Sequence, residues 1–165
     1  GLNKEGIDYR GFIFVGLMNC DGEPRVIEYN CRMGDPETEV VIPRIKSDLL
    51  DLLQGVASQT LESKSYETID EIATTVVMVS GGYPGEFEKG KRVQGLDDVK
   101  ESLVFHSGTK QDEENVLTNG GRVFAITSFG RSIEDAVKKS FLSADKIKYD
   151  GKYYRRDIGR DLIKN

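Results

Sequence analysis

Residues 26–39 read VIEYNCRMGDPETE, and the side chains of this stretch decide which fold and chemistry the sequence predicts. Glu28 and Asn30 stand two apart at the end of a run of β-forming residues. Because side chains alternate along a strand, both project from one face, and Arg32 continues that face where the chain stays extended. A carboxylate and an amide oxygen beside a triphosphate suit Mg²⁺, and a guanidinium there stabilises charge that develops during phosphoryl transfer. The alternative is a strand end with merely solvated polar side chains.

The residues that follow favour the metal and phosphate interpretation. Gly34 and Asp35-Pro36 interrupt regular structure directly before a predicted helix start. A helix N-terminus offers free backbone N–H groups to an anion. The stretch therefore predicts a strand end, a polar loop and a helix start gathered around a charged ligand.

The surrounding sequence predicts an α+β fold in two parts. The elements predicted for the first part are strands at 9–18 and 25–29, a turn at 21–22, and helices at 37–45 and 48–56. Pro43 is expected to kink or divide the first of these helices. Residues 58–68 turn polar, which places a predicted boundary near Gln59 and predicts domains at 1–59 and 60–165.

The second part is predicted to be a small domain of antiparallel sheet with helices. Its predicted elements are strands at 72–79, 103–105 and 123–129, a polar loop at 109–121 that ends in a tight turn, and a helix at 133–147 capped by Ser132. Pro84 and Gly85 suit the two central positions of a type II turn. The tail at 149–165 is expected to be ordered.

The composition of the chain limits the classes of protein to which it can belong. The chain has 165 residues, of which 38% are hydrophobic and 31% charged, and its apolar runs are too short to span a bilayer. A net charge of -5 gives no basic field for nucleic acid. Cys20 and Cys31 lack the spacing of a redox or zinc motif, so free thiols and a cytoplasmic location are expected. The start has no initiator Met, so it is expected to be a boundary within a longer protein.

Residues 26–39, with YRGFIFVGLM before them and PRIKSDLLDL after them, resemble the end of the ATP-grasp domain of the phosphoribosylamine-glycine ligase family. These enzymes are also called glycinamide ribonucleotide synthetases. The resemblance continues in order through GGYPGEFEKG (81–90), VFHSGT (104–109), NGGRV (119–123) and YYRRDIG (153–159), which are similar to landmarks of that family's small C-terminal domain. It covers nearly the whole chain.

The resemblance implies an ATP-dependent carbon-nitrogen ligase of de novo purine biosynthesis. Glycine would attack the γ-phosphate of ATP to give a glycyl phosphate, and the amine of 5-phosphoribosylamine would displace phosphate to give glycinamide ribonucleotide. Glu28 and Asn30 match the metal ligands for Mg²⁺ or Mn²⁺. Arg32 is implied as the catalytic residue. The implied substrate-binding residues are Arg32, Asp35, Glu37 and Thr38, without an assignment of each to glycine or to the ribose phosphate.

The sequence also departs from what the wider ATP-grasp superfamily carries. Other members commonly have a further acidic metal ligand on the preceding strand, but residues 12–18 contain no carboxylate. Either Glu28 and Asn30 hold the metal with phosphate and water oxygens, or another part of the protein supplies the missing ligand. The ATP-binding lobes precede this segment in the family. The N-terminal remainder of the same enzyme is therefore an expected partner, and this segment alone is expected to be inactive.

Two other functions remain open at the level of sequence. A biotin-carboxylase-like or other ATP-grasp enzyme also has a strand-end Glu-x-Asn-x-Arg pattern, although the Gly-Asp-Pro-Glu-Thr continuation argues against it. A non-catalytic interaction module is the second alternative. Calorimetry with Mg-ATP and a substrate screen would separate these possibilities.

Four further features have mainly structural interpretations. His106 is the single histidine and is expected at a strand end, satisfied by hydrogen bonds. Cys31 is expected to pack beneath the loop, since no histidine or basic cluster lies near it in the sequence to activate a thiolate. Residues 81–85 lack the spacing of a P-loop, and residues 155–157 are expected to form surface ion pairs.

Overall fold

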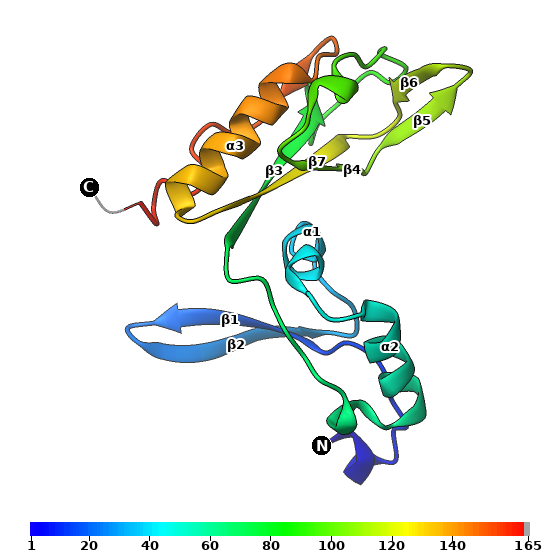
Figure 1. The fold of residues 1–165 in the computed structure, drawn as a ribbon, viewed down its shortest axis with the longest axis vertical. Coiled ribbons are helices and arrows are strands. Elements are labelled where there is room, and N and C mark those ends of the chain that lie inside the picture. Colours follow the sequence, from blue (N-terminus) through cyan, green and yellow to red (C-terminus); the bar gives the residue numbers. More distant parts are fainter. Residues whose placement is uncertain (164–165) are drawn as a thin grey trace. The chain divides into compact units, whose positions relative to one another are not determined.

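The structure is a computed structural model that describes residues 1–163. The chain divides into two compact units, Gly1–Ile69 and Asp70–Asn165, which are described separately below (Figure 1). Both contain antiparallel strands and helices, so the predicted α+β class is confirmed. Within residues 1–163, no helix has the length and apolar character needed to cross a membrane.

The first unit is built on a two-stranded antiparallel hairpin. It begins with a short 3-10 helix, η1 (Leu2–Glu5), and the hairpin pairs β1 (Phe14–Cys20) with β2 (Glu23–Asn30). Asp21 and Gly22 both have positive φ at the turn, and the Asn19 side chain accepts a hydrogen bond from the Gly22 N–H at 2.7 Å. The predicted order of strand, turn and strand is therefore confirmed, although the first strand begins at Phe14 rather than at residue 9.

The hairpin has one apolar face and one mixed face. Directly paired residues of an antiparallel ladder point to the same side, so Val15 with Tyr29 and Leu17 with Val26 form the apolar face. This face is bare, because Leu17 is 56% exposed and Tyr29 is 69% exposed. The opposite face carries Gly16 paired with Glu28, together with Asn30.

Short helices follow the hairpin. They are α1 (Thr38–Val41), the 3-10 helix η2 (Ile42–Arg44), α2 (Leu49–Ser58) and the 3-10 helix η3 (Leu61–Ser63). The change from α1 to η2 falls at Pro43, as the sequence predicted, because proline lacks the N–H that continues an α-helix. Asp48 caps α2, since its carboxylate accepts hydrogen bonds from the N–H groups of Leu50 and Asp51.

Residues 60–69 attach to the first unit through backbone hydrogen bonds. The Lys46 N–H donates to the Glu67 carbonyl at 2.9 Å, and the Ile69 N–H donates to the Arg44 carbonyl at 2.8 Å. The division into compact units therefore lies after the polar stretch. The domain limits of 1–59 and 60–165 concern where one family domain ends and the next begins, and they stay a prediction.

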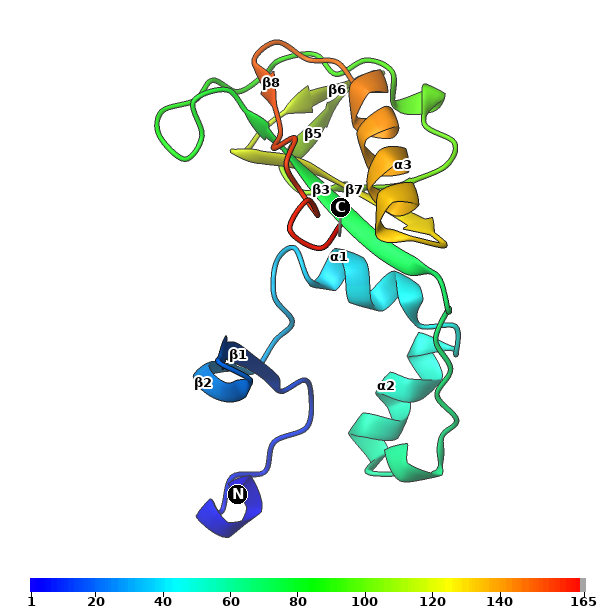
Figure 2. The same cartoon turned by 90° about the vertical axis from the view of Figure 1, so that its left-hand side faces the viewer.

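The second unit is a four-stranded antiparallel sheet with a helix against it (Figure 2). The strand order is β4 (Leu103–His106), β7 (Arg122–Gly130), β3 (Ile72–Ser80) and β8 (Lys152–Tyr153). A 3-10 helix, η4 (Leu96–Asp98), precedes β4, and α3 (Ile133–Lys146) packs on β3 and β7. The predicted helix cap is confirmed, because the Ser132 hydroxyl accepts a hydrogen bond from the Asp135 N–H at 3.2 Å.

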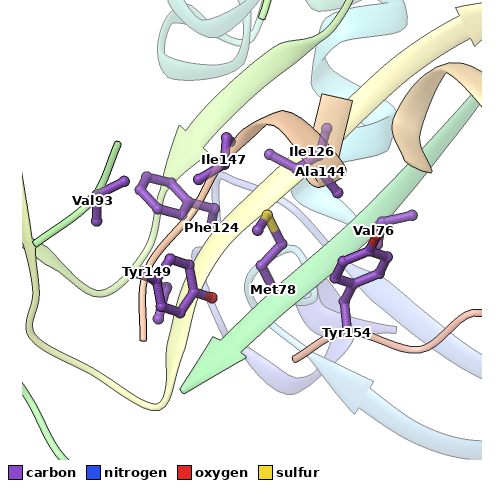
Figure 3. Close-up of a cluster of buried hydrophobic side chains, with 10 residues drawn as sticks. Val76, Met78, Val93, Phe124, Ile126, Ala144, Ile147, Tyr149 and Tyr154 are labelled. Carbon is purple, nitrogen blue, oxygen red and sulfur yellow. The ribbon is translucent and has the colours of Figure 1, made fainter. Parts of the chain in front are cut away.

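The core of this unit lies between the sheet and α3 (Figure 3). Side chains from β3, β7 and α3 meet there with aromatic side chains that follow the helix. The residues of this cluster are Val76, Met78, Val93, Val123, Phe124, Ile126, Ala144, Ile147, Tyr149 and Tyr154. Burial of this apolar surface is the main stabilising contribution to the unit.

Two predictions for this unit are wrong. The polar loop at 109–121 contains a second hairpin, which pairs β5 (Thr109–Asp112) with β6 (Asn115–Thr118). Its strands pair although β5 is polar, because cross-strand hydrogen bonds and the partly buried Val116 hold them. The positive φ at residues 81–85 belongs to Gly82 rather than to Gly85, so a type II turn centred on Pro84-Gly85 is excluded.

Candidate active site

The end of β2 brings Glu28 and Asn30 to one face of the hairpin. In the β1–β2 ladder Glu28 pairs with Gly16 and Asn30 pairs with Phe14, two positions apart on both strands. The regular alternation of the strand therefore points both polar side chains to the same side. The chain leaves the strand after Asn30 and enters the loop that leads to α1.

A hollow of about 330 Å³ lies where this strand end meets the loop. Its lining residues are Phe14, Glu28, Asn30, Arg32, Met33, Gly34, Asp35 and Glu37. Five of the six side chains that the sequence singled out therefore converge on one space, with carboxylate, amide and guanidinium groups around it.

Thr38 is the sixth predicted site residue, and it does not line the hollow. Its hydroxyl donates a hydrogen bond to the Gly34 carbonyl at 2.6 Å, and its N–H donates to the same oxygen at 3.0 Å. These bonds close the loop at the start of α1. In this structure Thr38 supports the shape of the loop.

The side-chain oxygens of the hollow can supply part of the coordination shell of a hard divalent cation. Glu28 is exposed and offers a carboxylate, and the half-buried Asn30 offers its amide oxygen. No group of three or more His, Cys, Asp or Glu side chains that could hold a metal occurs within residues 1–163. A cation at Glu28 and Asn30 would therefore complete its shell with oxygens from water or phosphate, as Mg²⁺ commonly does.

Arg32 contributes positive charge at the rim of the hollow. Its side chain is exposed, and Nη1 donates a hydrogen bond to the Met33 carbonyl at 3.3 Å. A guanidinium has five N–H donors, so most of its capacity is available for a carboxylate or phosphate. The hollow thus combines oxygen ligands for a cation with a donor group for an anion.

Cys31 corrects one expectation from the sequence. Its side chain is exposed, so it does not pack beneath the loop. Cys31 follows the last residue of β2 and does not line the hollow. Cys20 and Cys31 are both free thiols, as the sequence predicted.

Two other sequence features have structural partners. The His106 ring nitrogen Nδ1 lies 2.9 Å from the Thr109 hydroxyl, which agrees with a strand-end histidine satisfied by hydrogen bonds. Arg155 donates two hydrogen bonds to Asp157, at 2.9 and 2.7 Å, and both side chains are exposed. The expectation of surface ion pairs is therefore confirmed.

Sequence reasoning missed three contributors to the hollow. Phe14 and Met33 supply apolar wall, and Gly34 is buried in the loop. Phe14 could have been found by pairing the two predicted strands around the turn, because that pairing sets it opposite Asn30. The position of Met33 and Gly34 depends on how the loop folds back, which no local pattern encodes.

Comparison with known protein families gives two matches that together span most of the chain. Residues 73–161 match the family described as phosphoribosylglycinamide synthetase, C domain. Residues 1–38 match phosphoribosylglycinamide synthetase, ATP-grasp (A) domain. The hollow therefore lies in the part of the chain that is similar to the ATP-grasp domain.

Individual relatives agree with the family matches. The chain is 43% identical to a phosphoribosylamine-glycine ligase of Chlorobaculum tepidum, covering 99% of the chain and 39% of that protein. It is 42% identical to the Escherichia coli ligase, covering 96% of the chain and 38% of that protein. The crystal structure of the Thermotoga maritima ligase superposes with a TM-score of 0.79 at 36% identity, covering 94% of this chain and 39% of that one. The chain thus spans about two fifths of the length of these proteins.

Proposed function

Because this chain belongs to the phosphoribosylglycinamide synthetase family, we propose that it is the C-terminal portion of a phosphoribosylamine-glycine ligase. The complete enzyme would join glycine to 5-phosphoribosylamine at the expense of ATP, in de novo purine biosynthesis. The observation that carries this proposal is the hollow at the end of β2, where Glu28, Asn30, Arg32, Asp35 and Glu37 converge.

The reaction assigns a task to each kind of group in the hollow. The glycine carboxylate attacks the γ-phosphate of ATP, giving glycyl phosphate and ADP. The amine of phosphoribosylamine then attacks the carbonyl carbon, and phosphate leaves. Negative charge grows on the transferring phosphoryl group, so Arg32 is proposed to donate hydrogen bonds to it and stabilise that charge.

Glu28 and Asn30 are the residues that we propose would hold Mg²⁺ or Mn²⁺. Such a cation would neutralise charge on the phosphate oxygens of ATP when bound. Asp35 and Glu37 are proposed to bind the substrates, because a carboxylate accepts hydrogen bonds from hydroxyl and amino groups. Thr38 is included in the proposed substrate-binding set because it closes the loop that carries Asp35 and Glu37.

The N-terminal remainder of the same enzyme is the proposed partner of this chain. The support comes from the bare apolar face of the hairpin, because a two-stranded hairpin with one open apolar face is marginally stable in water. The share of the relatives' length that the chain spans also agrees with this proposal. We expect this portion alone to be catalytically inactive. The two free thiols support a reducing cytoplasmic location.

The test uses the complete polypeptide that contains this chain. ATP consumption should require glycine and phosphoribosylamine together. Glu28→Ala and Asn30→Ala should each reduce kcat/KM by at least about 100-fold, because each removes a ligand of the cation that the phosphates need. The measurement is steady-state release of ADP, with circular dichroism to show that each variant is folded.

Cys31→Ala is the matched control, since this exposed side chain stands between Asn30 and Arg32 in the sequence but does not line the hollow. It should retain the parent activity. ATP consumption without either substrate would overturn the proposed reaction. Full activity in Glu28→Ala or Asn30→Ala would overturn the metal assignment.

A further inference from the structure

Each of the two glutamate side chains of the hollow lies close to the α-carbon of a glycine. A Cβ atom on Gly16 would lie 3.1 Å from Cγ of Glu28, its partner across the hairpin. A Cβ atom on Gly34 would overlap Oε2 of Glu37 and would lie 2.8 Å from its Cδ. The Glu37 carboxylate therefore occupies volume that any larger residue at position 34 would fill, whereas the contact between a Cβ on Gly16 and Glu28 would only be tight.

Space, rather than backbone conformation, requires glycine at position 34. Gly34 does not belong to the residues with positive φ, so an alanine fits the backbone there without strain. The residue is buried, and its carbonyl is held by the two hydrogen bonds from Thr38. The consequence of adding a methyl group is therefore confined to the Glu37 side chain, which must turn away.

We propose that Gly34 is a positioning residue that directs the Glu37 carboxylate into the hollow. There the carboxylate accepts hydrogen bonds from the amino group of a substrate. The assignment of this ligand rests on the proposed function, because glycine and phosphoribosylamine both carry an amine. Glu37 is otherwise an exposed side chain directly before α1, and several rotamers would carry it into solvent.

Gly34→Ala in the complete enzyme tests the proposal. The variant should fold normally, and kcat/KM for one amine-bearing substrate should fall about 10- to 100-fold, because small misplacements of binding groups are costly. The concentration of Mg²⁺ that gives half-maximal rate should change little. Gly16→Ala is the milder comparison, because its Cβ would require Glu28 Cγ to move only slightly, and it should lower kcat/KM less than Gly34→Ala does.

A double-mutant cycle separates positioning from a general effect on the loop. If Gly34 acts through Glu37, then adding Gly34→Ala to Glu37→Ala should cause no further loss of kcat/KM. If the two losses multiply, Gly34 acts through something other than Glu37 and the proposal is wrong. Cys31→Ala again serves as the control, and it should leave both kinetic constants unchanged.

A crystal structure of the Gly34→Ala variant gives a readout that does not depend on activity. The Glu37 carboxylate should have left the space above residue 34. A carboxylate still lying over the added methyl group would overturn the proposal even if activity fell. If the parent enzyme lacks the ligase reaction, the proposed function fails, but the crystal structure still decides whether Gly34 directs Glu37.

Discussion

Asp145 fastens the C-terminal segment to α3. Its carboxylate accepts a hydrogen bond from the Tyr154 hydroxyl and two from the Arg156 guanidinium, at 2.8 and 3.2 Å. The guanidinium also lies 4.5 Å from the centre of the Tyr154 ring. Partial burial of the Asp145 carboxyl raises its pKa, but the hydrogen bonds and positive charges around it outweigh that effect and hold the pKa below 3.8.

Because its pKa is lowered, the Asp145 carboxylate stabilises the folded protein only over a defined pH range. A group with a lower pKa in the folded state stabilises the protein above its unfolded pKa and loses that effect as pH falls through the folded pKa. Asp145→Asn should therefore lower Tm by about 2 to 5 °C at pH 7, a small value because the pair is largely exposed. The difference should shrink below pH 3.8. Thermal unfolding from pH 7 to pH 2, with exposed Asp97→Asn as the control, measures it.

At the scale of residues, strand alternation was enough to place Glu28 and Asn30 on one face, whereas Arg32 reaches the same hollow from the loop that follows the strand. Alternation could not predict the contacts that form only when the loop folds back onto α1. The carbonyl of Gly34 and the carboxylate of Glu37 meet other groups only once the loop has closed onto α1. Cys31 follows the end of β2, so its exposure depends on how the loop leaves the strand, and the expectation of packing could not include this.

A chain of hydroxyl groups joins α3 to the sheet in the second unit. The Thr74 and Ser140 oxygens lie 3.1 Å apart, and Ser140 donates to Ser128 at 2.9 Å. Ser102 then lies 2.7 Å from Ser128 and 2.6 Å from Ser143. Ser128, Ser140 and Ser143 are buried, so these hydroxyls depend on one another for hydrogen bonds.

Ser128 is the centre of this chain, and its removal should be costly. Ser128→Ala leaves the buried Ser140 hydroxyl and the half-buried Ser102 hydroxyl each with one partner fewer, which should cost about 1 to 3 kcal/mol of unfolding free energy. Urea denaturation measures the loss. The exposed Ser107→Ala is the control and should change stability little.

Ser140→Ala in the Ser128→Ala background tests whether the hydroxyls act together. The combined loss should be smaller than the sum of the single losses, because the second change removes a group that already lacked its partner. Additive losses would mean that each serine contributes separately, for example by packing alone.

At the scale of elements, local chemistry identified those with strong patterns. The branched run that forms β3 and the Ser132 cap of α3 were both predictable, because propensity and capping are properties of a few adjacent residues. The β5–β6 hairpin was missed because its first strand is polar. Its stability comes from cross-strand pairing and from Val116, which packs against the core of the unit.

The two units of the molecule differ in how much core they have. The second unit has the buried cluster between its sheet and α3. Within residues 1–69, all of which the structure describes, Leu52 is the single buried hydrophobic side chain. The apolar face of the β1–β2 hairpin is left open, although the opposite face carries the proposed metal ligands. The sequence predicted two parts, but the alternation of apolar residues could not reveal that one face lacks a cover.

This difference predicts how each unit behaves when the 165-residue chain is studied alone. Amide hydrogens protected by a core exchange through larger and rarer openings than those of an uncovered hairpin. Amides of β3, β7 and α3 should therefore exchange slowly, whereas those of β1 and β2 should exchange at least about 100-fold faster.

The exchange rates of the β1 and β2 amides should fall in the complete enzyme. There the remaining segments would cover the apolar face formed by Val15, Leu17, Val26 and Tyr29, so the amides of β1 and β2 should become protected. Hydrogen exchange followed by mass spectrometry on both proteins makes the comparison, with the β7 amides as the internal reference. If β1 and β2 exchange as slowly as β7 in the isolated chain, the hairpin is stable without a cover, and its open face no longer supports an N-terminal partner.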